Sequence, residues 1–95
     1  GQFFTWFGKI NIINSKYKDD LKPISENCKC YNCVTFTRAY IRHLFKINDT
    51  LGLRLATLHN VYFYMELMKE IRMQISKDSF FEWSNKIKDL ISSKV

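Results

Sequence analysis

The residues of this chain best suited to chemistry are three cysteines and a histidine, Cys28, Cys30, Cys33 and His59. They form a C-x-C-x2-C…H pattern that uses every cysteine in the chain. Three thiolates and one imidazole complete a tetrahedral shell for zinc, and sulfur-rich donor sets favour such a metal. Because four protein ligands leave no position for water or substrate, the pattern predicts one structural zinc ion rather than a catalytic one.

Two features of this pattern leave alternatives open. The C-x2-C spacing of Cys30 and Cys33 is also compatible with a redox pair, although Cys28 two residues away favours a metal. A disulfide framework is disfavoured because it would leave one of the three cysteines unpaired. The fourth ligand is less certain from spacing alone, since His43 inside a predicted helix competes with His59 just after a break in the helical pattern.

Other candidate chemistry is weak. The adjacent carboxylates of Asp19 and Asp20 lie in a polar stretch, where a solvated loop is the simpler interpretation. Serine, histidine and aspartate form no spaced triad, and the chain has no Gly-rich phosphate loop. A basic row of Arg38, Arg42 and Lys46 could follow a phosphate backbone or could be a solvated helix face. On its own residues, the chain is not expected to be an enzyme.

The elements that must position the zinc ligands can be read from the hydrophobic spacing. Residues 3–13 alternate well enough for a small hairpin, with a tight turn predicted at Gly8-Lys9. A polar loop leads from there to the knuckle at 28–33. Helical spacing then predicts a helix over 35–48, a second and longer one containing His59, and a third that starts at a Ser79–Glu82 capping box. The fold class is therefore α+β: a hairpin and a zinc knuckle followed by about three helices.

Composition sets further bounds. Ninety-five residues allow a single domain or part of one, and a structural metal helps a chain of this size to fold. The net charge of +6 suits a polyanionic partner or a solvated basic surface. No secretory signal is present and no apolar run approaches the roughly 18 residues of a membrane span. Cysteines used as metal ligands suit a reducing cytoplasm, so we expect a cytoplasmic protein without membrane contact, and the start at Gly1 suggests a piece of a longer chain.

Several segments together resemble one known family. The chain reads Cys28-Lys29-Cys30-Tyr31-Asn32-Cys33, then Thr37-Arg38-Ala39-Tyr40-Ile41-Arg42-His43-Leu44, then Leu51-Gly52 and His59-Asn60. In this order they closely resemble the C-terminal part of bacterial tRNA-guanine transglycosylase, and the similarity extends upstream to Asn11-Ile12 and Asp20-Leu21-Lys22-Pro23. The family spacing from the third cysteine to its histidine matches Cys33 and His59, so the resemblance favours His59 over His43.

The resemblance implies a function. Enzymes of this family exchange the wobble guanine of certain tRNAs for a queuine precursor base, on a (β/α)8 barrel with a zinc-binding insertion. The zinc-bearing part packs on the barrel and helps to form a homodimer and the tRNA surface. The nucleophile and the base-binding residues would lie upstream of Gly1. We therefore expect a single fragment over 1–95 that is inactive alone, with hairpin and loop at 1–27, knuckle at 28–33 and helical part at 34–93.

A departure from the family pattern concerns tRNA contact. The family usually carries Arg where this chain has Ile13, and a basic residue where it has Lys16. Lys16 is therefore the expected nucleic-acid contact, while Ile13 removes one positive charge. A rival hypothesis from another class is a free-standing zinc module that binds RNA or protein without catalysis.

Overall fold

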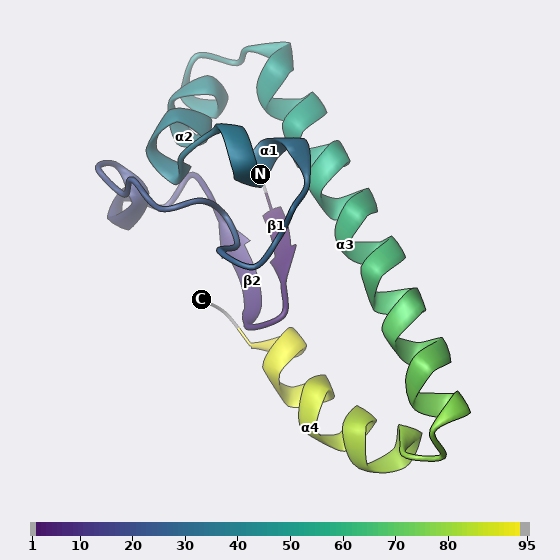
Figure 1. The fold of residues 1–95 in the computed structure, drawn as a ribbon. Helices are drawn as coiled ribbons and strands as arrows, with labels where there is room; N and C mark the ends of the chain where they lie inside the picture. The colour runs from purple at the N-terminus through teal and green to yellow at the C-terminus, as the bar shows by residue number, and fades with distance from the viewer. Residues whose placement is uncertain (1, 94–95) are drawn as a thin grey trace.

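The computed structural model describes residues 2–93 and confirms the α+β class, with a two-stranded hairpin followed by helices (Figure 1). No helix within residues 2–93 combines the length and apolar character needed to cross a membrane. In chain order the elements are β1 (Gln2–Thr5), β2 (Gly8–Asn11), a 3-10 turn η1 (Ser15–Tyr17), α1 (Tyr31–Thr35), α2 (Arg38–Lys46), α3 (Thr50–Ser76) and α4 (Phe80–Ser92).

The hairpin turn lies two residues earlier than the sequence suggested. Thr5 pairs with Gly8, so the two-residue loop is Trp6-Phe7 and not Gly8-Lys9. Gly8 has a φ of 130°, and a β-carbon there would collide with the backbone of Ser93. The glycine is therefore required both by its positive φ and by the close approach of Ser93.

One face of the hairpin forms the centre of the core. Phe3 and Ile10 are paired across the strands, and both are completely buried. The polar loop that follows the hairpin also contributes to this core, because its residues Tyr17 and Ile24 are buried there. Two residues of α2, Ile41 and Leu44, belong to the same core.

The first predicted helix is shorter than expected, and a separate short helix precedes it. The segment 35–48 contains α2, whose first turn is capped by the Thr37 hydroxyl accepting the N–H of Tyr40 at 3.2 Å. The short α1 precedes it within the knuckle and was not predicted as a separate helix. Its N-cap is Cys30, one of the predicted zinc ligands. The sulfur of Cys30 accepts a backbone N–H of the helix, a place usually held by a hydroxyl or carboxylate oxygen.

The two remaining helices follow the predicted order, but the capping box predicted at the start of α4 does not form. Ser79 is the N-cap residue, yet its side chain makes no capping bond and instead donates to Gln74 Oε1 at 2.6 Å. Asp78 beside it has a φ of 56°, which turns the chain sharply between α3 and α4. The local turn geometry therefore displaces the serine hydroxyl from the helix end.

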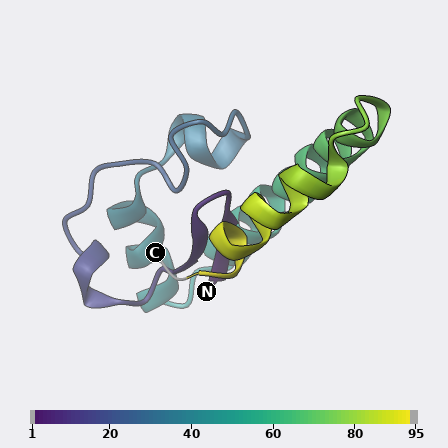
Figure 2. The ribbon, with the colours of Figure 1, turned by 90° about the horizontal axis from the view of Figure 1, so that it is seen from below.

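The two long helices form an arm. The α4 helix turns back from the end of α3 toward the hairpin, and the pair extends away from the knuckle (Figures 1 and 2). The described chain is accordingly elongated, with extents of 46 × 22 × 18 Å. Only the first half of α3 is well covered, since its buried residues are Gly52, Leu55, His59 and Phe63. The wide apolar arc of this helix is thus largely unburied beyond Phe63.

Candidate metal centre

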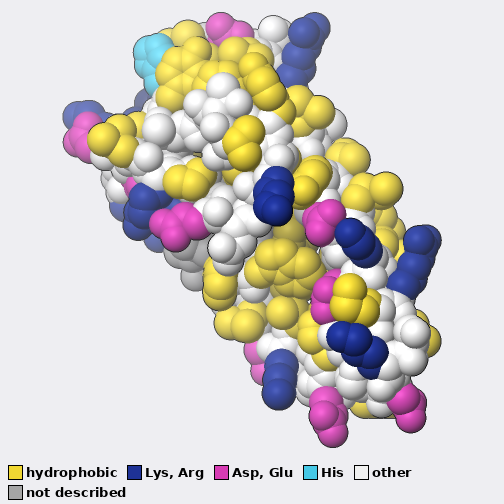
Figure 3. All heavy atoms as spheres, in the orientation of Figure 1, with side chains coloured by type: hydrophobic (Ala, Val, Ile, Leu, Met, Phe, Trp, Pro, Cys, Tyr) yellow, Lys and Arg dark blue, Asp and Glu magenta, His cyan; other side chains and the backbone are white. Residues whose placement is uncertain are grey.

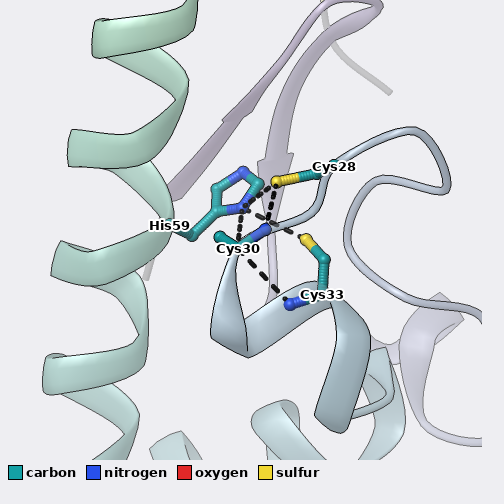
Figure 4. Close-up of side chains that lie close together, drawn as sticks. All are labelled: Cys28, Cys30, Cys33 and His59. Carbon is teal, nitrogen blue, oxygen red and sulfur yellow. Dashed lines mark hydrogen bonds between the residues drawn. The ribbon is translucent and has the colours of Figure 1, made fainter.

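Four side chains from two distant parts of the chain converge at one point. Cys28 lies in the loop before α1, Cys30 caps that helix, Cys33 lies within it, and His59 comes from the middle of α3. Their donor atoms all lie within 4.8 Å of one another, and the four side chains gather at one place between the knuckle and α3 (Figure 4). The structure thus brings together the four residues predicted as ligands.

The spacing of the donors fits a tetrahedral zinc ion. His59 Nδ1 lies 3.8 Å from the sulfur of Cys28, 3.4 Å from that of Cys30 and 3.3 Å from that of Cys33. The bond lengths usual for zinc put a nitrogen and a sulfur donor about 3.6 Å apart at a tetrahedral angle. All three thiols are free of disulfide bonds. The four donors therefore form a site for one structural zinc ion.

The backbone of the knuckle is folded around the sulfurs. The N–H of Cys30 donates to Cys28 Sγ at 3.5 Å, and the N–H of Cys33 donates to Cys30 Sγ at 3.4 Å. Hydrogen bonds of this kind favour the negatively charged thiolate that binds a metal. The C-x-C-x2-C spacing is what allows one tight turn to supply both ligands and donors.

The orientation of His59 is fixed from behind. Its Nε2 lies 2.7 Å from the carbonyl oxygen of Phe4 in β1, and a carbonyl can only accept. Nε2 therefore carries the proton and donates it, which leaves the lone pair of Nδ1 facing the sulfurs. Burial lowers the pKa of His59, so the imidazole stays neutral, the form that binds metal.

Burial makes ionisation of Cys28 and Cys33 unfavourable without a metal. Burial raises the pKa of the Cys33 thiol far above its usual range, and burial also raises that of Cys28. Zinc supplies, when bound, the positive charge that makes the three thiolates favourable, and its binding free energy is then folding free energy. The cluster is thus built for a cation and would be poorly suited to a reactive low-pKa cysteine.

Comparison with known proteins identifies the family. The family model for queuine tRNA-ribosyltransferase matches residues 1–92. The chain belongs to the queuine tRNA-ribosyltransferase family. Among the curated enzymes of that name, it is 51% identical to the one from Clostridium acetobutylicum over 85 residues and 49% identical to the one from Chromobacterium violaceum over 80 residues.

The family match covers most of this chain but a small part of its relatives. The aligned residues are 90% and 84% of the chain, and only 23% and 22% of the two relatives, respectively. The enzyme from Thermosipho africanus, 51% identical over 82 residues, shows the same proportions of 86% and 22%. The chain therefore spans about a fifth of the length of the queuine tRNA-ribosyltransferases that it matches.

Other candidate residues lie away from the cluster. His43, the competing histidine, is exposed on α2 and is not among the clustered donors. Lys16 is exposed on η1, with its ammonium group 5.2 Å from the ring of Tyr17. Asp20 is not part of a solvated carboxylate pair, because it forms an ion pair with Arg38 at 3.1 Å. The basic row therefore loses Arg38, whose guanidinium serves the fold.

Sequence reasoning missed the groups that support the histidine. The Phe4 carbonyl belongs to the backbone, so the type of residue at position 4 does not indicate this contact. Asn60 follows His59 in the recognised motif, and its carboxamide contacts the carbonyl of Gln2 and the N–H of Phe4 in the same strand. The motif pair His59-Asn60 was the available signal, but its meaning depends on a strand more than fifty positions away.

Proposed function

We propose that this chain is the zinc-binding C-terminal portion of a tRNA-guanine transglycosylase, which exchanges the wobble guanine of tRNA for a queuine precursor base. Family membership over residues 1–92 carries the proposal, together with the Cys3His cluster. Cys28, Cys30, Cys33 and His59 would bind one zinc ion as a structural staple. Residues 1–95 act as one unit here: hairpin and loop at 1–27, knuckle at 28–33 and helical part at 34–93.

The apolar surface of α3 supports packing against the remainder of such an enzyme, a catalytic barrel located upstream. Figure 3 shows hydrophobic side chains along this helix. Val61, Tyr64 and Met65 are 57–64% exposed, and Leu53 and Leu58 line an apolar surface hollow nearer its start. Apolar surface of this extent on one element is typical of an interface. The barrel would bring the catalytic groups, so this chain alone would turn over no guanine.

An aromatic patch on α1 and α2 supports homodimer formation. The rings of Phe36 and Tyr40 stack at 5.3 Å with 12° between their planes, and Tyr31 packs edge-on against Phe36 at 5.7 Å. Tyr31 and Tyr40 remain exposed, as does Val34 between them. Hydrophobic side chains gather over this part of the molecule in Figure 3. Aromatic side chains of this kind are enriched at protein interfaces, and a second copy is the partner proposed here.

A role in tRNA contact rests on charge. The net charge is +6, and Lys16 is the basic residue that the family pattern places toward the tRNA backbone. Arg38 makes no such contribution because it is engaged by Asp20 and two carbonyl groups. Replacement of Lys16 by Glu in the full enzyme should weaken tRNA binding and flatten its dependence on salt. A cytoplasmic location follows from tRNA as the substrate.

The decisive test is a chimera with one of the relatives. The C-terminal part of the Clostridium acetobutylicum enzyme is replaced by this chain, and incorporation of labelled guanine into tRNA is measured. We expect activity in the chimera, none in this chain alone, and none in a chimera carrying Cys33→Ser. A folded, zinc-loaded chimera without exchange would contradict the proposal. Salt-sensitive RNA binding by the inactive chain would then support the free-standing module instead.

A further inference from the structure

The open edge of the hairpin is covered by two consecutive residues of α3. Since β1 pairs with β2 on one side only, its other edge would leave backbone groups without partners. Asn60 Oδ1 accepts the N–H of Phe4 at 3.0 Å, and Asn60 Nδ2 donates to the carbonyl of Gln2 at 3.0 Å. The carboxamide thus occupies the place of a peptide group from a third strand.

The same strand residue contacts the metal cluster. The carbonyl of Phe4 accepts the proton of His59 Nε2 at 2.7 Å, while the N–H of Phe4 is held by Asn60. One residue of β1 is therefore fixed at both its backbone polar groups by neighbouring side chains of α3. Any shift of β1 along α3 would move the acceptor away from Nε2.

We propose that Asn60 is a positioning residue for the zinc site, which acts by holding the Phe4 carbonyl on His59 Nε2. The inference rests on the proposed ligation of zinc by His59. A partner of the outer ring nitrogen fixes the tautomer and the ring orientation of a metal-binding histidine. Asn60 touches no donor atom itself, so its effect passes through β1.

The alternative is that Asn60 only stabilises the fold. Zinc affinity does not separate the two roles, because any loss of folding free energy also weakens zinc binding when metal and folding are linked. The Nε2 proton of His59 does separate them, since it reports the hydrogen bond in the folded, zinc-loaded chain. The visible spectrum of the cobalt-substituted chain reports the donor geometry in the same state.

The experiment compares the wild-type chain with Asn60→Ala and Asn60→Asp, all loaded with one zinc per chain. We expect exchange of the His59 Nε2 proton with water, followed by NMR, to be about tenfold faster in Asn60→Ala, the factor that corresponds to the loss of a hydrogen bond worth about 1.4 kcal/mol. The cobalt bands should shift as well. Asn60→Asp keeps the acceptor for Phe4 but loses the donor to Gln2, so a smaller increase is expected. If Asn60→Ala does not fold, the comparison of Asn60→Asp with wild type tests the inference instead.

The control is Asp49→Ala, which destabilises the chain by removing the N-cap of α3, where Asp49 Oδ1 accepts the N–H of Leu51 at 2.9 Å, away from β1 and the four donors. It should leave proton exchange and cobalt bands as in wild type. If both Asn60 variants bind one zinc per chain and show the proton exchange rate and cobalt bands of wild type, the role of Asn60 is overturned. The ligation of zinc by His59 would then still hold. Less than one zinc in the wild-type chain would overturn the ligation by His59 and this inference with it.

Discussion

Arg38 and Asp20 form a nearly buried ion pair, with Nη1 and Oδ2 3.1 Å apart and each side chain only 14% exposed. The guanidinium uses its other nitrogens on the backbone, with Nε donating to the Pro23 carbonyl at 3.0 Å and Nη2 to that of Ile24 at 3.1 Å. One side chain at the start of α2 thus ties down the loop that leads into the zinc knuckle. A residue that resembled a phosphate contact is a fold determinant.

Replacement of Arg38 by Lys should destabilise the zinc-loaded chain by about 2 kcal/mol, because an ammonium group cannot reproduce the forked contacts to Asp20 and two carbonyls. Urea unfolding followed by circular dichroism measures the change. Arg54→Lys, at an exposed position on α3, should differ from wild type by no more than about 0.5 kcal/mol. Equal losses in the two variants would contradict the role assigned to Arg38.

The pH dependence of this ion pair can be predicted in sign. Burial acts to raise the pKa of Asp20, but the N–H of Lys22 and the bond and charge of Arg38 outweigh it, so the pKa lies below its usual 3.8. A carboxyl group whose pKa is lowered by folding stabilises the folded chain at any pH above its pKa in the unfolded chain. This stabilisation is lost as the pH falls through the pKa in the folded chain. The stability difference between wild type and Asp20→Asn should therefore stay constant from about pH 8 to about pH 5. Below about pH 4 the difference should shrink, and a difference that stays constant or grows from about pH 5 down to about pH 3 would show that the pKa of Asp20 is not lowered.

Gly8→Ala should be among the more damaging changes outside the metal cluster. The residue has a φ of 130°, and an added β-carbon would meet Ser93, whose carbonyl accepts the N–H of Lys9 at 2.9 Å. Backbone strain and the displaced chain end together should cost about 2–3 kcal/mol. Thermal melts of the zinc-loaded chain test this, with Lys9→Ala at an exposed neighbour as the control. A melting temperature unchanged by Gly8→Ala would mean that the end of α4 is not held at the hairpin.

Removal of a zinc ligand should unfold the knuckle. The apparent free energy of structural zinc binding, about 10–16 kcal/mol, is comparable to the whole stability of a small domain. Cys30→Ser should therefore lose both bound zinc and much of the helical circular dichroism signal. His43→Ala, which removes the exposed histidine of α2, should keep one zinc per chain. A Cys30→Ser chain with wild-type helicity would argue against a structural role for the metal.

The three thiols should differ in reactivity. Cys30 and Cys33 are 5% and 8% exposed, whereas Cys28 is half-buried and lines a surface pocket beside Lys29 and Tyr62. Limiting maleimide on the zinc-loaded chain, followed by peptide mass mapping, should therefore label Cys28 severalfold faster than the other two. Equal labelling of all three would show that the cluster opens as a whole before it reacts.

The fold was predictable where it depends on local spacing. Helical periodicity located α2, α3 and α4, because a buried face repeats every three to four residues in the chain itself. The turn of the hairpin was predicted two residues too late, because the glycine at position 8 suggested a turn there. In the structure Gly8 follows the turn and lies where the backbone of Ser93 comes close to it. The capping box at Ser79 failed for a similar reason, because Gln74 takes the hydroxyl.

The sequence by itself determined the donor set, since three cysteines within six positions and a histidine can serve few purposes other than a sulfur-rich metal site. It also determined the family, through motifs whose order and spacing survive without any structure. Only the tertiary structure decided how His59 is held, because its tautomer depends on a backbone carbonyl of Phe4, fifty-five positions away. It likewise decided that Arg38 stabilises the loop. Contacts between distant segments follow from the packing of the whole chain, and residue type and spacing do not encode them separately.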